Sequence, residues 1–469
     1  MLSPSIEQGG GVEPSTNSNP YGSPSAPDRL PREPRPSTAG VCFCRVIPYQ
    51  SATHRLDSFM TTLPLDPARI RALFPAFAEP SLQGQAFFEN AGGSYTARPV
   101  LDKLDHYYRA TKVQPYGYYP ASIAAGEAMN LSFERMAQAL NVTADWIHFG
   151  PSASANTYIL GKAFGEWLKP GDAVIVTNQD HEANTGNWRR LAKMGAEIRE
   201  WRVDPTTGRL SLADLDKLLD SKVKLIAAPH CSNVAGEINP VAEIAARAKS
   251  VGAVTAIDGV SYAPHGLPDL QTLGADIYFF SAYKVYGPHQ GIMAVRPELA
   301  MALPNQGHFF NDTKPRYRLT PAGPDHAQIA ASSGIADYLE TVAEIAGNAV
   351  AGENPFRRAH AAMRAQEIAL ATPLLDYLRK KNSVRLIGPD DPAIRAPTIA
   401  LGLAEPGAAV AARLARHGIM ASGGNFYAWR LLEAVGIDPN HGVLRLSFTH
   451  YTSPEEVDQL IAALDAELP

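Results

Sequence analysis

The chain has 469 residues, which is enough for one large core and a second smaller one, because single cores usually stop growing at about 250–300 residues. Hydrophobic residues make up 45% of the sequence and charged residues 19%, and the net charge is −5. The sequence has no run of basic residues, which argues against a protein that binds nucleic acid through positive charge. It also has no apolar stretch of about 18 residues, which argues against a membrane-spanning protein. We therefore expect a cytoplasmic protein with neither nucleic acid nor a membrane as its partner.

The cysteines and histidines suggest neither disulfides nor a metal. The three cysteines, Cys42, Cys44 and Cys231, form no CxxC pair and no disulfide framework. The 13 histidines show no HExxH motif and no paired metal-ligand spacing. We expect no metal site.

Residues 1–59 contain nine prolines and nine serines and lack apolar periodicity, so we predict that this segment is disordered. It has no apolar region behind a basic start, and its acidic residues argue against an organellar transit peptide. Sequence typical of folded protein begins after Met60. We expect residues 60–97 to pack on a small C-terminal domain and on the active site.

From about residue 98, short apolar runs rich in β-branched and aromatic residues alternate with helical stretches, which is typical of a mainly parallel sheet covered by helices on both faces. We predict a large α/β domain over residues 98–325. Its predicted helices include Ser154–Leu168 and Pro240–Ser250. Its predicted strands are Trp146–Phe149, Ala173–Thr177, Glu197–Val203, Leu225–Pro229, Val254–Ile257, Ile277–Phe280 and Ile292–Val295.

A smaller α+β domain is predicted over residues 326–469, and a long helix leads into it. Its predicted strands are Arg385–Ile387, Thr398–Leu401 and Val443–Phe448. The final segment, SPEEVDQLIAALDAEL, is typical of an amphipathic helix with a capping box, in which Ser453 is the N-cap and Glu456 follows three residues later.

Polar residues that directly follow the predicted strands are candidates for a binding site, because open parallel sheets bind ligands at the carboxyl ends of their strands. In FGPSASANTY, a strand leads into a helix at about Ser154, and its free N–H groups suit a phosphate, although Ser and Asn also serve as ordinary helix caps. His181 and Asn184 follow the next strand, in TNQDHEANTGNW. Asn233 follows another, in PHCSNVAGEINP.

Asp258 and Lys284 carry the most specific signal. Asp258 ends an apolar strand, where a buried carboxylate needs a cationic partner. Lys284 follows a nearly uncharged aromatic strand, beside Ser281 and Tyr283, and a poorly solvated lysine has a lowered pKa that suits Schiff-base formation. A lysine for an aldehyde, an aspartate for a ring nitrogen and a phosphate-binding turn are what pyridoxal 5'-phosphate requires.

Six motifs occur in order between about Phe87 and Leu464: FFENAGGS, HEANTGNW, PHCSNVAG, IDGVSYAPHG, FFSAYKVYGP and VLRLSFTHYTSPEEVDQLI. In this order they resemble the class V aminotransferase family of fold-type I pyridoxal-phosphate enzymes, and most closely its cysteine-desulfurase-like branch. The resemblance implies a PLP-dependent transferase-like fold, with a large, mainly parallel seven-stranded sheet domain and a smaller C-terminal α+β domain. It also implies a homodimer.

The resemblance implies a role for each candidate residue. Lys284 would hold the cofactor as a Schiff base, and Asp258 would pair with the ring nitrogen. His181 would stack on the ring and, with these two, form the catalytic set. Asn233 would hydrogen-bond to the ring hydroxyl. The implied phosphate ligands are Ala153, Ser154, Ser281 and Tyr283.

The resemblance also implies a substrate side to the pocket. Arg445, in VLRLSF, would bind the substrate carboxylate, for which a guanidinium fork is well shaped. Asn90 and Ala91, in the NAGGS segment, would line this side.

The chain departs from the family pattern in several places. Cysteine desulfurases use a mobile cysteine on a loop of the C-terminal half, but the stretch GIMASGGNFYAWRLL contains none. We therefore do not expect desulfurase chemistry through an enzyme persulfide, and we interpret Cys231 as a buried structural thiol. Ser261 stands where the family commonly has Gln, and Pro324 follows Gly323 where a Gly-Thr pair is usual, which affects the expected contact of a partner subunit with the phosphate.

These motifs predict a pyridoxal-phosphate enzyme acting on a small amino acid, with sulfur-containing amino acids among the candidates. The leading hypothesis is a β-eliminating lyase or a transaminase. One alternative is an amino-acid epimerase of the isopenicillin N epimerase type. Another is a non-catalytic protein that binds pyridoxal phosphate.

Overall fold

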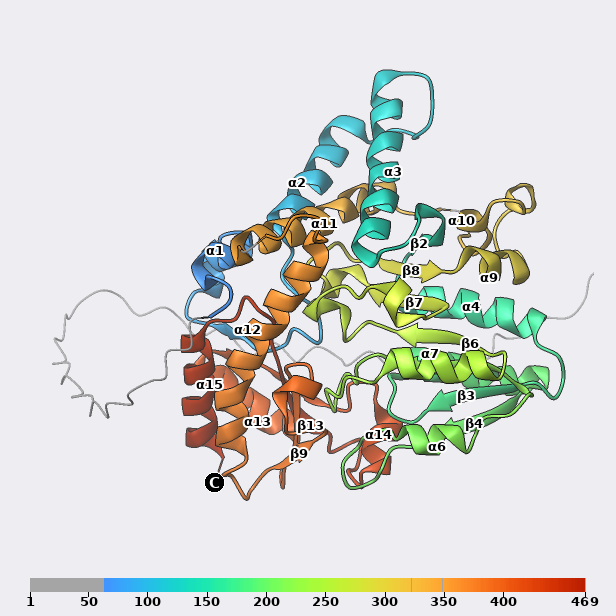
Figure 1. Cartoon of the computed structure of the whole chain (residues 1–469). Helices are drawn as coiled ribbons and strands as arrows, with labels where there is room; N and C mark the ends of the chain where they lie inside the picture. The colour runs from blue at the N-terminus through green and yellow to red at the C-terminus, as the bar shows by residue number, and fades with distance from the viewer. Residues whose placement is uncertain (1–62, 322, 348, 469) are drawn as a thin grey trace, which may run out of the picture. The chain divides into compact units, whose positions relative to one another are not determined.

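A computed structural model describes residues 63–321, 323–347 and 349–468 of the chain. The segment 1–59, for which we predict disorder, lies outside these residues. Within them, helices and strands alternate along most of the chain (Figure 1). None of the helices in this part of the chain is long and apolar enough to cross a membrane.

Seven strands form the main sheet, in the order β2-β8-β7-β6-β5-β3-β4. Strand β8 runs antiparallel to both of its neighbours, whereas β3 to β7 pair in parallel. The predicted mainly parallel seven-stranded sheet is thus confirmed, with strand ends that differ by one or two residues. The strands are β2 (Ile147–Gly150), β3 (Ala173–Thr177), β4 (Glu197–Trp201), β5 (Val223–Pro229), β6 (Val254–Asp258), β7 (Ile277–Ser281) and β8 (Gly291–Val295).

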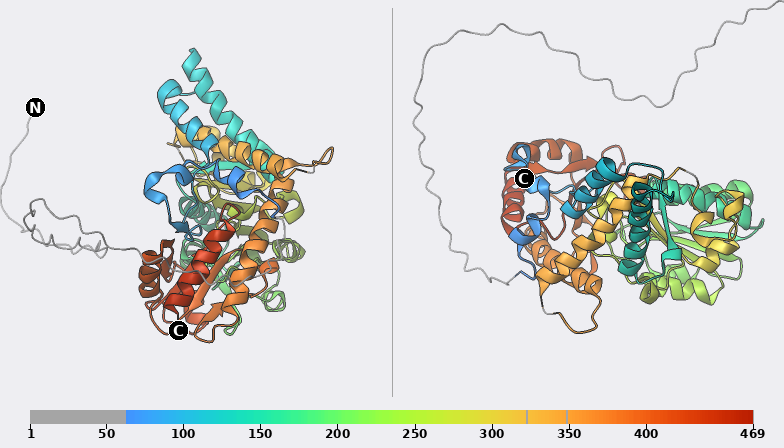
Figure 2. Two further views of the ribbon diagram at one scale, coloured as in Figure 1. Left: turned by 90° about the vertical axis from the view of Figure 1, so that its left-hand side faces the viewer. Right: turned by 90° about the horizontal axis from the view of Figure 1, so that it is seen from above.

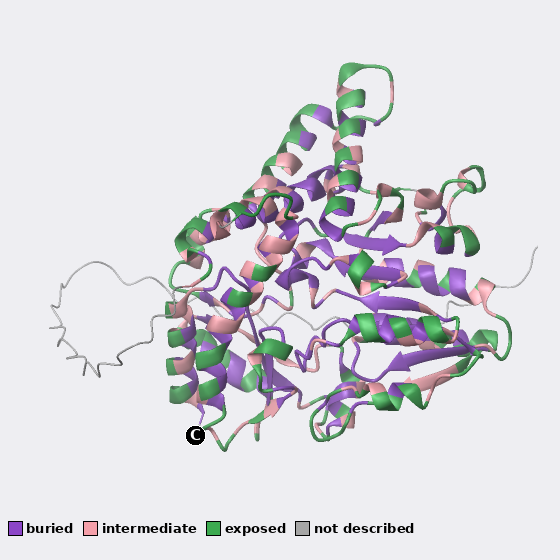
Figure 3. Cartoon of the chain, in the orientation of Figure 1, coloured by how far each residue is buried: buried purple, intermediate pink, exposed green. Residues whose placement is uncertain are grey.

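Helices cover both faces of this sheet, which explains why most of its strands are apolar, whereas the edge strand β4 (EIREW) is partly exposed. Side chains alternate between the faces along each strand. Val174 and Val176 of β3 belong to a buried cluster with residues of helices α4 and α5, whereas Ala173 and Ile175 belong to the larger cluster that includes residues of α3, α7 and α11. Figure 3 shows these strands buried, while the covering helices expose their outer sides.

The helices associated with the sheet and with the N-terminal segment vary widely in length. They are α1 (Pro67–Arg71), α2 (Arg98–His106), α3 (Pro120–Leu140), α4 (Ala153–Trp167), α5 (Glu182–Arg189), α6 (Leu212–Asp216), α7 (Val241–Ser250), α8 (Leu270–Leu273), α9 (Pro297–Ala302) and α10 (Pro315–Arg318). The predicted helices Ser154–Leu168 and Pro240–Ser250 correspond to α4 and α7.

Two long helices, not the single one expected, lead into the C-terminal part: α11 (His326–Ala346) and α12 (Pro355–Leu378). They are followed by a four-stranded antiparallel sheet in the order β12-β13-β10-β9. The remaining elements are β9 (Arg385–Ile387), β10 (Thr398–Gly402), α13 (Gly407–Leu414), β12 (Ser422–Gly424), α14 (Trp429–Ala434), β13 (Val443–Ser447) and α15 (Pro454–Glu467). The predicted capping box of Ser453 and Glu456 begins α15, which lies beside α12 (Figure 2).

An N-terminal segment joins the C-terminal part to the end of β7. Strand β1 (Ala86–Phe87) pairs in parallel with β11 (Ile419–Met420), and Glu89 then forms a bridge with Ser447. A few residues later, the Ser94 hydroxyl donates a hydrogen bond of 2.8 Å to the carbonyl of Lys284. The residues between Glu89 and Ser94 are therefore held next to Lys284.

Candidate active site

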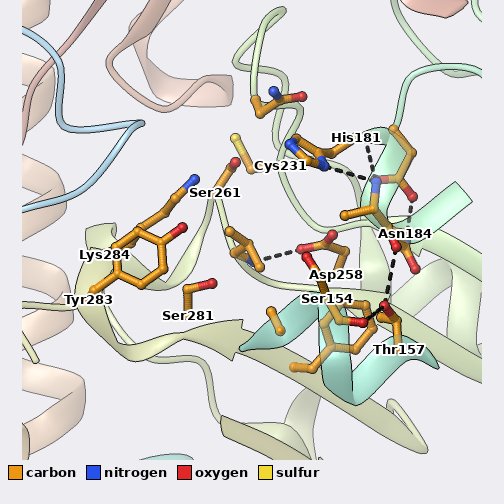
Figure 4. A pocket seen from close by; sticks show the side chains of 16 residues that line it. Ser154, Thr157, His181, Asn184, Cys231, Asp258, Ser261, Ser281, Tyr283 and Lys284 are labelled. Atoms are coloured by element: carbon orange, nitrogen blue, oxygen red, sulfur yellow. Dashed lines mark hydrogen bonds between the residues drawn. The ribbon is translucent and has the colours of Figure 1, made fainter. Parts of the chain in front are cut away.

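A pocket with about 520 Å³ of empty space lies at the carboxyl ends of the parallel strands. Figure 4 shows Lys284, Tyr283 and Ser281 on one side of it and His181 and Asn184 on the other. All eight residues expected to contact a cofactor line this pocket: Ala153, Ser154, His181, Asn233, Asp258, Ser281, Tyr283 and Lys284. The fold thus brings together, at the carboxyl ends of the strands, side chains that are up to 131 positions apart in the sequence, from 153 to 284.

Lys284 presents a buried amine to the pocket. It ends the short turn Ala282–Lys284 that follows β7, and its exposed fraction is 8%. Burial and, to a smaller extent, the nearby charge of Arg445 lower the pKa of Lys284 to about 8, while Asp258 and Glu89 act in the opposite direction. A neutral, nucleophilic amine is therefore available at mildly alkaline pH.

Asp258 ends β6 and is buried in the same pocket. Its Oδ1 accepts a hydrogen bond of 2.8 Å from the backbone N–H of Val260. Burial raises the pKa of Asp258 to about 6, although this hydrogen bond and the charge of Lys284 favour the ionised form. A cation placed in the pocket would favour the ionised form further.

Asp180 is a second buried carboxylate in the pocket, and the sequence analysis missed it. It accepts hydrogen bonds from the side chain of Asn184 and from the backbone N–H of His181. Burial, together with the charge of Asp258, raises the pKa of Asp180 well above its ordinary value. Its position next to His181, shortly after β3, was the feature of the sequence that could have marked it as a residue of the site.

His181 is positioned as a neutral ring. It is the N-cap of α5, and its Nδ1 accepts a hydrogen bond of 3.1 Å from the backbone N–H of Ala183, so the neutral ring carries its proton on Nε2. Burial, together with the charges of Lys284 and Arg445, lowers the pKa of His181 to about 4. Near neutral pH, the imidazole can therefore stack on a flat ligand without adding a positive charge.

Helix α4 begins at Ala153, and its N-cap is Ser152 rather than Ser154, near which we expected the helix to start. The Ser152 hydroxyl accepts a hydrogen bond from the backbone N–H of Ala155, which leaves the Ser154 hydroxyl free of capping. The first N–H groups of a helix have no partner within the helix and favour an anion. Ala153 and Ser154 are thus placed as an anion-binding turn.

Gly291 of β8 lies directly under this turn. A Cβ added at Gly291 would lie 2.3 Å from the carbonyl carbon of Ser152 and 2.6 Å from the backbone nitrogen of Ala153. Since both contacts are with backbone atoms, a side chain at this position would displace the anion-binding turn.

We predict that Gly291→Ala destabilises the protein by about 1–3 kcal/mol, the usual cost of overpacking, as measured by urea unfolding. Gly165→Ala, within α4, is the control. Its added methyl would meet the thioether of Met194, a flexible and largely exposed side chain that can move away. Equal losses of stability in the two variants would contradict the prediction.

Asn233 leaves one hydrogen-bonding atom unused. Its Nδ2 donates a bond of 2.8 Å to the carbonyl of Phe426, and its buried Oδ1 has no partner among the described residues. Tyr283 lines the same pocket, with its ring stacked on His289 at a centroid distance of 4.6 Å. The free Oδ1 is suited to accept a hydrogen bond from a ligand hydroxyl.

Asn90 and Ala91 lie beside Lys284 in a small adjoining pocket. The side chain of Asn90 is used inside the protein: its Nδ2 donates to the carbonyls of Phe87 and Ser447, and its Oδ1 accepts from the Tyr451 hydroxyl. Asn90 therefore shapes the wall of the pocket and has little hydrogen-bonding capacity left for a ligand.

Arg445 of β13 is buried near the pocket, where its charge affects both Lys284 and His181. Its Nη2 donates a hydrogen bond of 2.7 Å to the carboxylate of Glu89, which the sequence analysis also missed. Its guanidinium lies 3.8 Å from the centre of the Phe426 ring.

The loop that follows β12 borders the pocket. Phe426 and Tyr427 have φ angles of 51° and 58°, which bulky residues rarely adopt and which often mark functional sites. The carbonyl of Tyr427 accepts a hydrogen bond from the backbone of Glu182, and its ring lies 5.1 Å from that of His181.

Cys231 lines the pocket, but its thiol is buried and lies within 3.4 Å of the carbonyl oxygen of Gly236. Burial raises the pKa of Cys231 to about 12, which disfavours the nucleophilic thiolate. The other two cysteines, Cys42 and Cys44, lie outside the described residues.

Comparison with solved structures supports this architecture. The apo structure of a cysteine desulfurase from Thermococcus onnurineus NA1 superimposes with a TM-score of 0.75 at 24% identity, covering 86% of this chain and 98% of that one. The cysteine desulfurase CsdA from Escherichia coli gives a TM-score of 0.71, also at 24% identity, covering 86% of this chain and 98% of that one. At this level of identity, these likenesses show the fold alone.

Sequence comparison shows the family. "Aminotransferase-like protein FGM3" of Gibberella zeae is 35% identical over 414 residues, which cover 85% of this chain and 98% of that protein. A cysteine desulfurase of Serratia proteamaculans is 30% identical over 415 residues, covering 84% and 97% of the two chains. The sequence model of the family described as Aminotransferase class-V matches residues 86–460. The chain therefore belongs to the aminotransferase class-V family of enzymes.

Proposed function

We propose that this chain is a pyridoxal 5'-phosphate-dependent enzyme that acts at the α-carbon of a small amino acid. The observation that carries the proposal is the buried amine of Lys284, with a lowered pKa, in one pocket with the buried carboxylate of Asp258. An amine of this kind suits covalent attachment of an aldehyde, and the carboxylate suits a protonated ring nitrogen.

The residues of the pocket fit this cofactor. The start of α4, at Ala153 and Ser154, offers N–H groups to a phosphate. The unpartnered Oδ1 of Asn233 suits the ring hydroxyl, and the neutral ring of His181 suits stacking on the cofactor. Each part of the cofactor thus has a complementary group in the pocket.

When bound, pyridoxal phosphate supplies an aldehyde that joins to amines and a ring that withdraws electrons from the attached carbon. Asp258 would stabilise a positive charge on the ring nitrogen. Lys284 would hold the aldehyde, and its free amine would act as the general base for the α-proton of the substrate. Arg445 would orient the substrate through its carboxylate.

We propose that the reaction continues by loss of a β-substituent or by transfer of the amine. The raised pKa of Cys231 and the absence of a cysteine from the loop at residues 418–432 disfavour an enzyme persulfide. A sulfur substituent would therefore leave as free sulfide. The homodimer, the cytoplasmic location and the division into domains at residues 97 and 325 stay predictions from the sequence.

The pH dependence of cofactor attachment follows from the pKa of Lys284. The protonated amine is not nucleophilic, and the fraction of neutral amine increases as the pH rises through about 8. We predict that the rate of pyridoxal phosphate attachment to the cofactor-free protein increases about tenfold per pH unit below this value and levels off above it. Stopped-flow absorbance would measure this rate, and a rate that falls between pH 6 and 8 would contradict the assignment.

A screen of small amino acids tests the reaction type. It would follow pyruvate, ammonia and sulfide release together with exchange of the α-proton for deuterium. Pyruvate and ammonia would identify a lyase, and amine transfer to an oxo acid would identify a transaminase. Proton exchange with racemisation alone would identify an epimerase and contradict the proposed loss of a β-substituent or transfer of the amine. The absence of any reaction would contradict the proposed function as a whole. Sulfide release from cysteine that is lost in Cys231→Ala would restore a desulfurase mechanism.

A further inference from the structure

The guanidinium of Arg445 is held from several directions. Its Nη2 donates a hydrogen bond to Oε1 of Glu89 at 2.7 Å, and its Nη1 donates to the carbonyl of Asn233 at 3.2 Å. One face packs on the ring of Phe426. Only 4% of the Arg445 side chain is exposed, so the position of this charge is well defined.

In the part of the chain that the structure describes, the ion pair between Arg445 and Glu89 leaves one hydrogen-bonding atom of each side chain without a partner. Nε of Arg445 and Oε2 of Glu89 are both buried, and neither has a hydrogen-bond partner among the described residues. Buried polar atoms usually have partners, and a paired arginine and carboxylate often form two parallel hydrogen bonds. The unpartnered Nε of Arg445 lies beside Nη2, which donates the hydrogen bond to Glu89, so a differently placed carboxylate could accept hydrogen bonds from both nitrogens.

Glu89 is the more easily moved partner of the pair. Its side chain is 23% exposed, and within the described part of the chain Arg445 is the one group hydrogen-bonded to its carboxylate. The backbone of Glu89 is fixed by the bridge to Ser447, so movement would be confined to the side chain. Rotation of this side chain would free Nη2 of Arg445 without disturbing the sheet.

We propose that Glu89 is a specificity-determining residue that occupies the carboxylate site of Arg445 in the free enzyme and gives way to the carboxylate of the substrate. This inference rests on the proposed function, in which Arg445 binds that carboxylate. The exchange replaces one negative charge with another, so the buried Arg445 remains neutralised. A neutral ester or amide that displaced Glu89 would leave a buried charge without a partner, which is strongly unfavourable. Glu89 thus selects substrates with a free carboxylate.

The test measures binding of propionate, which has a carboxylate but no amine and cannot react with the cofactor. Titration calorimetry on the purified holoenzyme would compare the wild type with Glu89→Gln. Glutamine keeps the shape and one acceptor oxygen, but it removes the competing charge. Because charged hydrogen bonds are stronger than neutral ones by roughly 1 kcal/mol, we expect propionate to bind about fivefold more tightly to the variant.

Propionamide is the matched neutral ligand, and it should bind much more weakly than propionate to the wild type, because it cannot replace the charge of Glu89. Glu182→Gln is the matched protein control, because Glu182 pairs with Arg430 near the same pocket and has no contact with Arg445. The affinity of this control for propionate should equal that of the wild type. Should Glu89→Gln fail to fold, Glu89→Asp retracts the carboxylate and should also bind propionate more tightly than the wild type.

Unchanged or weaker binding of propionate to Glu89→Gln would overturn the inference, because Glu89 would then be a permanent support of Arg445. Equal affinities of the wild type for propionate and propionamide would also overturn it, since displacement of Glu89 would then not depend on the charge of the ligand. Failure of this inference can be distinguished from failure of the proposed function. If borohydride links the cofactor to Lys284 but propionate binding does not respond to the charge of Glu89, the role of Glu89 alone is wrong.

Discussion

Replacing Lys284 with alanine is expected to reduce kcat by about 10³-fold or more, within the range of 10²–10⁴ typical of a general base. The substitution removes the buried amine that we assign to cofactor attachment and to α-proton transfer. Both tasks require an unprotonated amine, which the lowered pKa of Lys284 makes available. Steady-state kinetics with the amino acid identified by the screen would measure the effect.

Lys162→Ala is the control for this substitution, because Lys162 is exposed on α4 and pairs with Glu166. Its kcat should match that of the wild type. Circular dichroism would verify that both variants are folded. A Lys284→Ala enzyme that keeps more than a tenth of the wild-type kcat would show that another group performs the proton transfer.

Replacing Asp258 with asparagine is expected to reduce kcat by about 10²–10⁴-fold, which corresponds to the roughly 3–5 kcal/mol lost when one partner of a buried charge pair is removed. Asparagine fills nearly the same volume, but its amide cannot balance a positive ring nitrogen. Asp258 is buried, so solvent cannot replace the lost charge. The visible absorption of the bound cofactor should shift at the same time, because the protonation of the ring changes.

Asp214→Asn is the charge-matched control, since Asp214 is exposed and forms a surface pair with Lys217. It should leave both kcat and the cofactor spectrum unchanged. If Asp258→Asn behaves like Asp214→Asn, the carboxylate of Asp258 does not face the ring nitrogen.

The large sheet was predictable because each strand carries a local signal. Strands that are buried on both faces have continuous apolar sequences. A run such as that of β3 therefore indicates both the strand and the position of its carboxyl end. The candidate site followed from the same signal, because Asp258 and Lys284 directly follow such runs. In the strands of the large sheet and in α4, the errors were confined to element ends, as at Ser152, where two serines lie within three residues and either could cap the helix.

The short elements and the long-range pairs could not be predicted. Strands β1 and β11 are two residues long, and their pairing joins positions more than 330 residues apart. The contact between Glu89 and Arg445 spans 356 residues and depends on that pairing. Asp180 was missed because its burial follows from the turn after β3, which leaves no periodic pattern in the sequence.

The most direct test of the central claim is reduction of the holoenzyme with borohydride, followed by peptide mass spectrometry. We predict that the pyridoxyl group is found on the peptide that contains Lys284, and that Lys284→Ala protein treated in the same way carries no label. A pyridoxyl group on a different lysine, or the absence of a visible cofactor band from protein saturated with pyridoxal phosphate, would contradict the account.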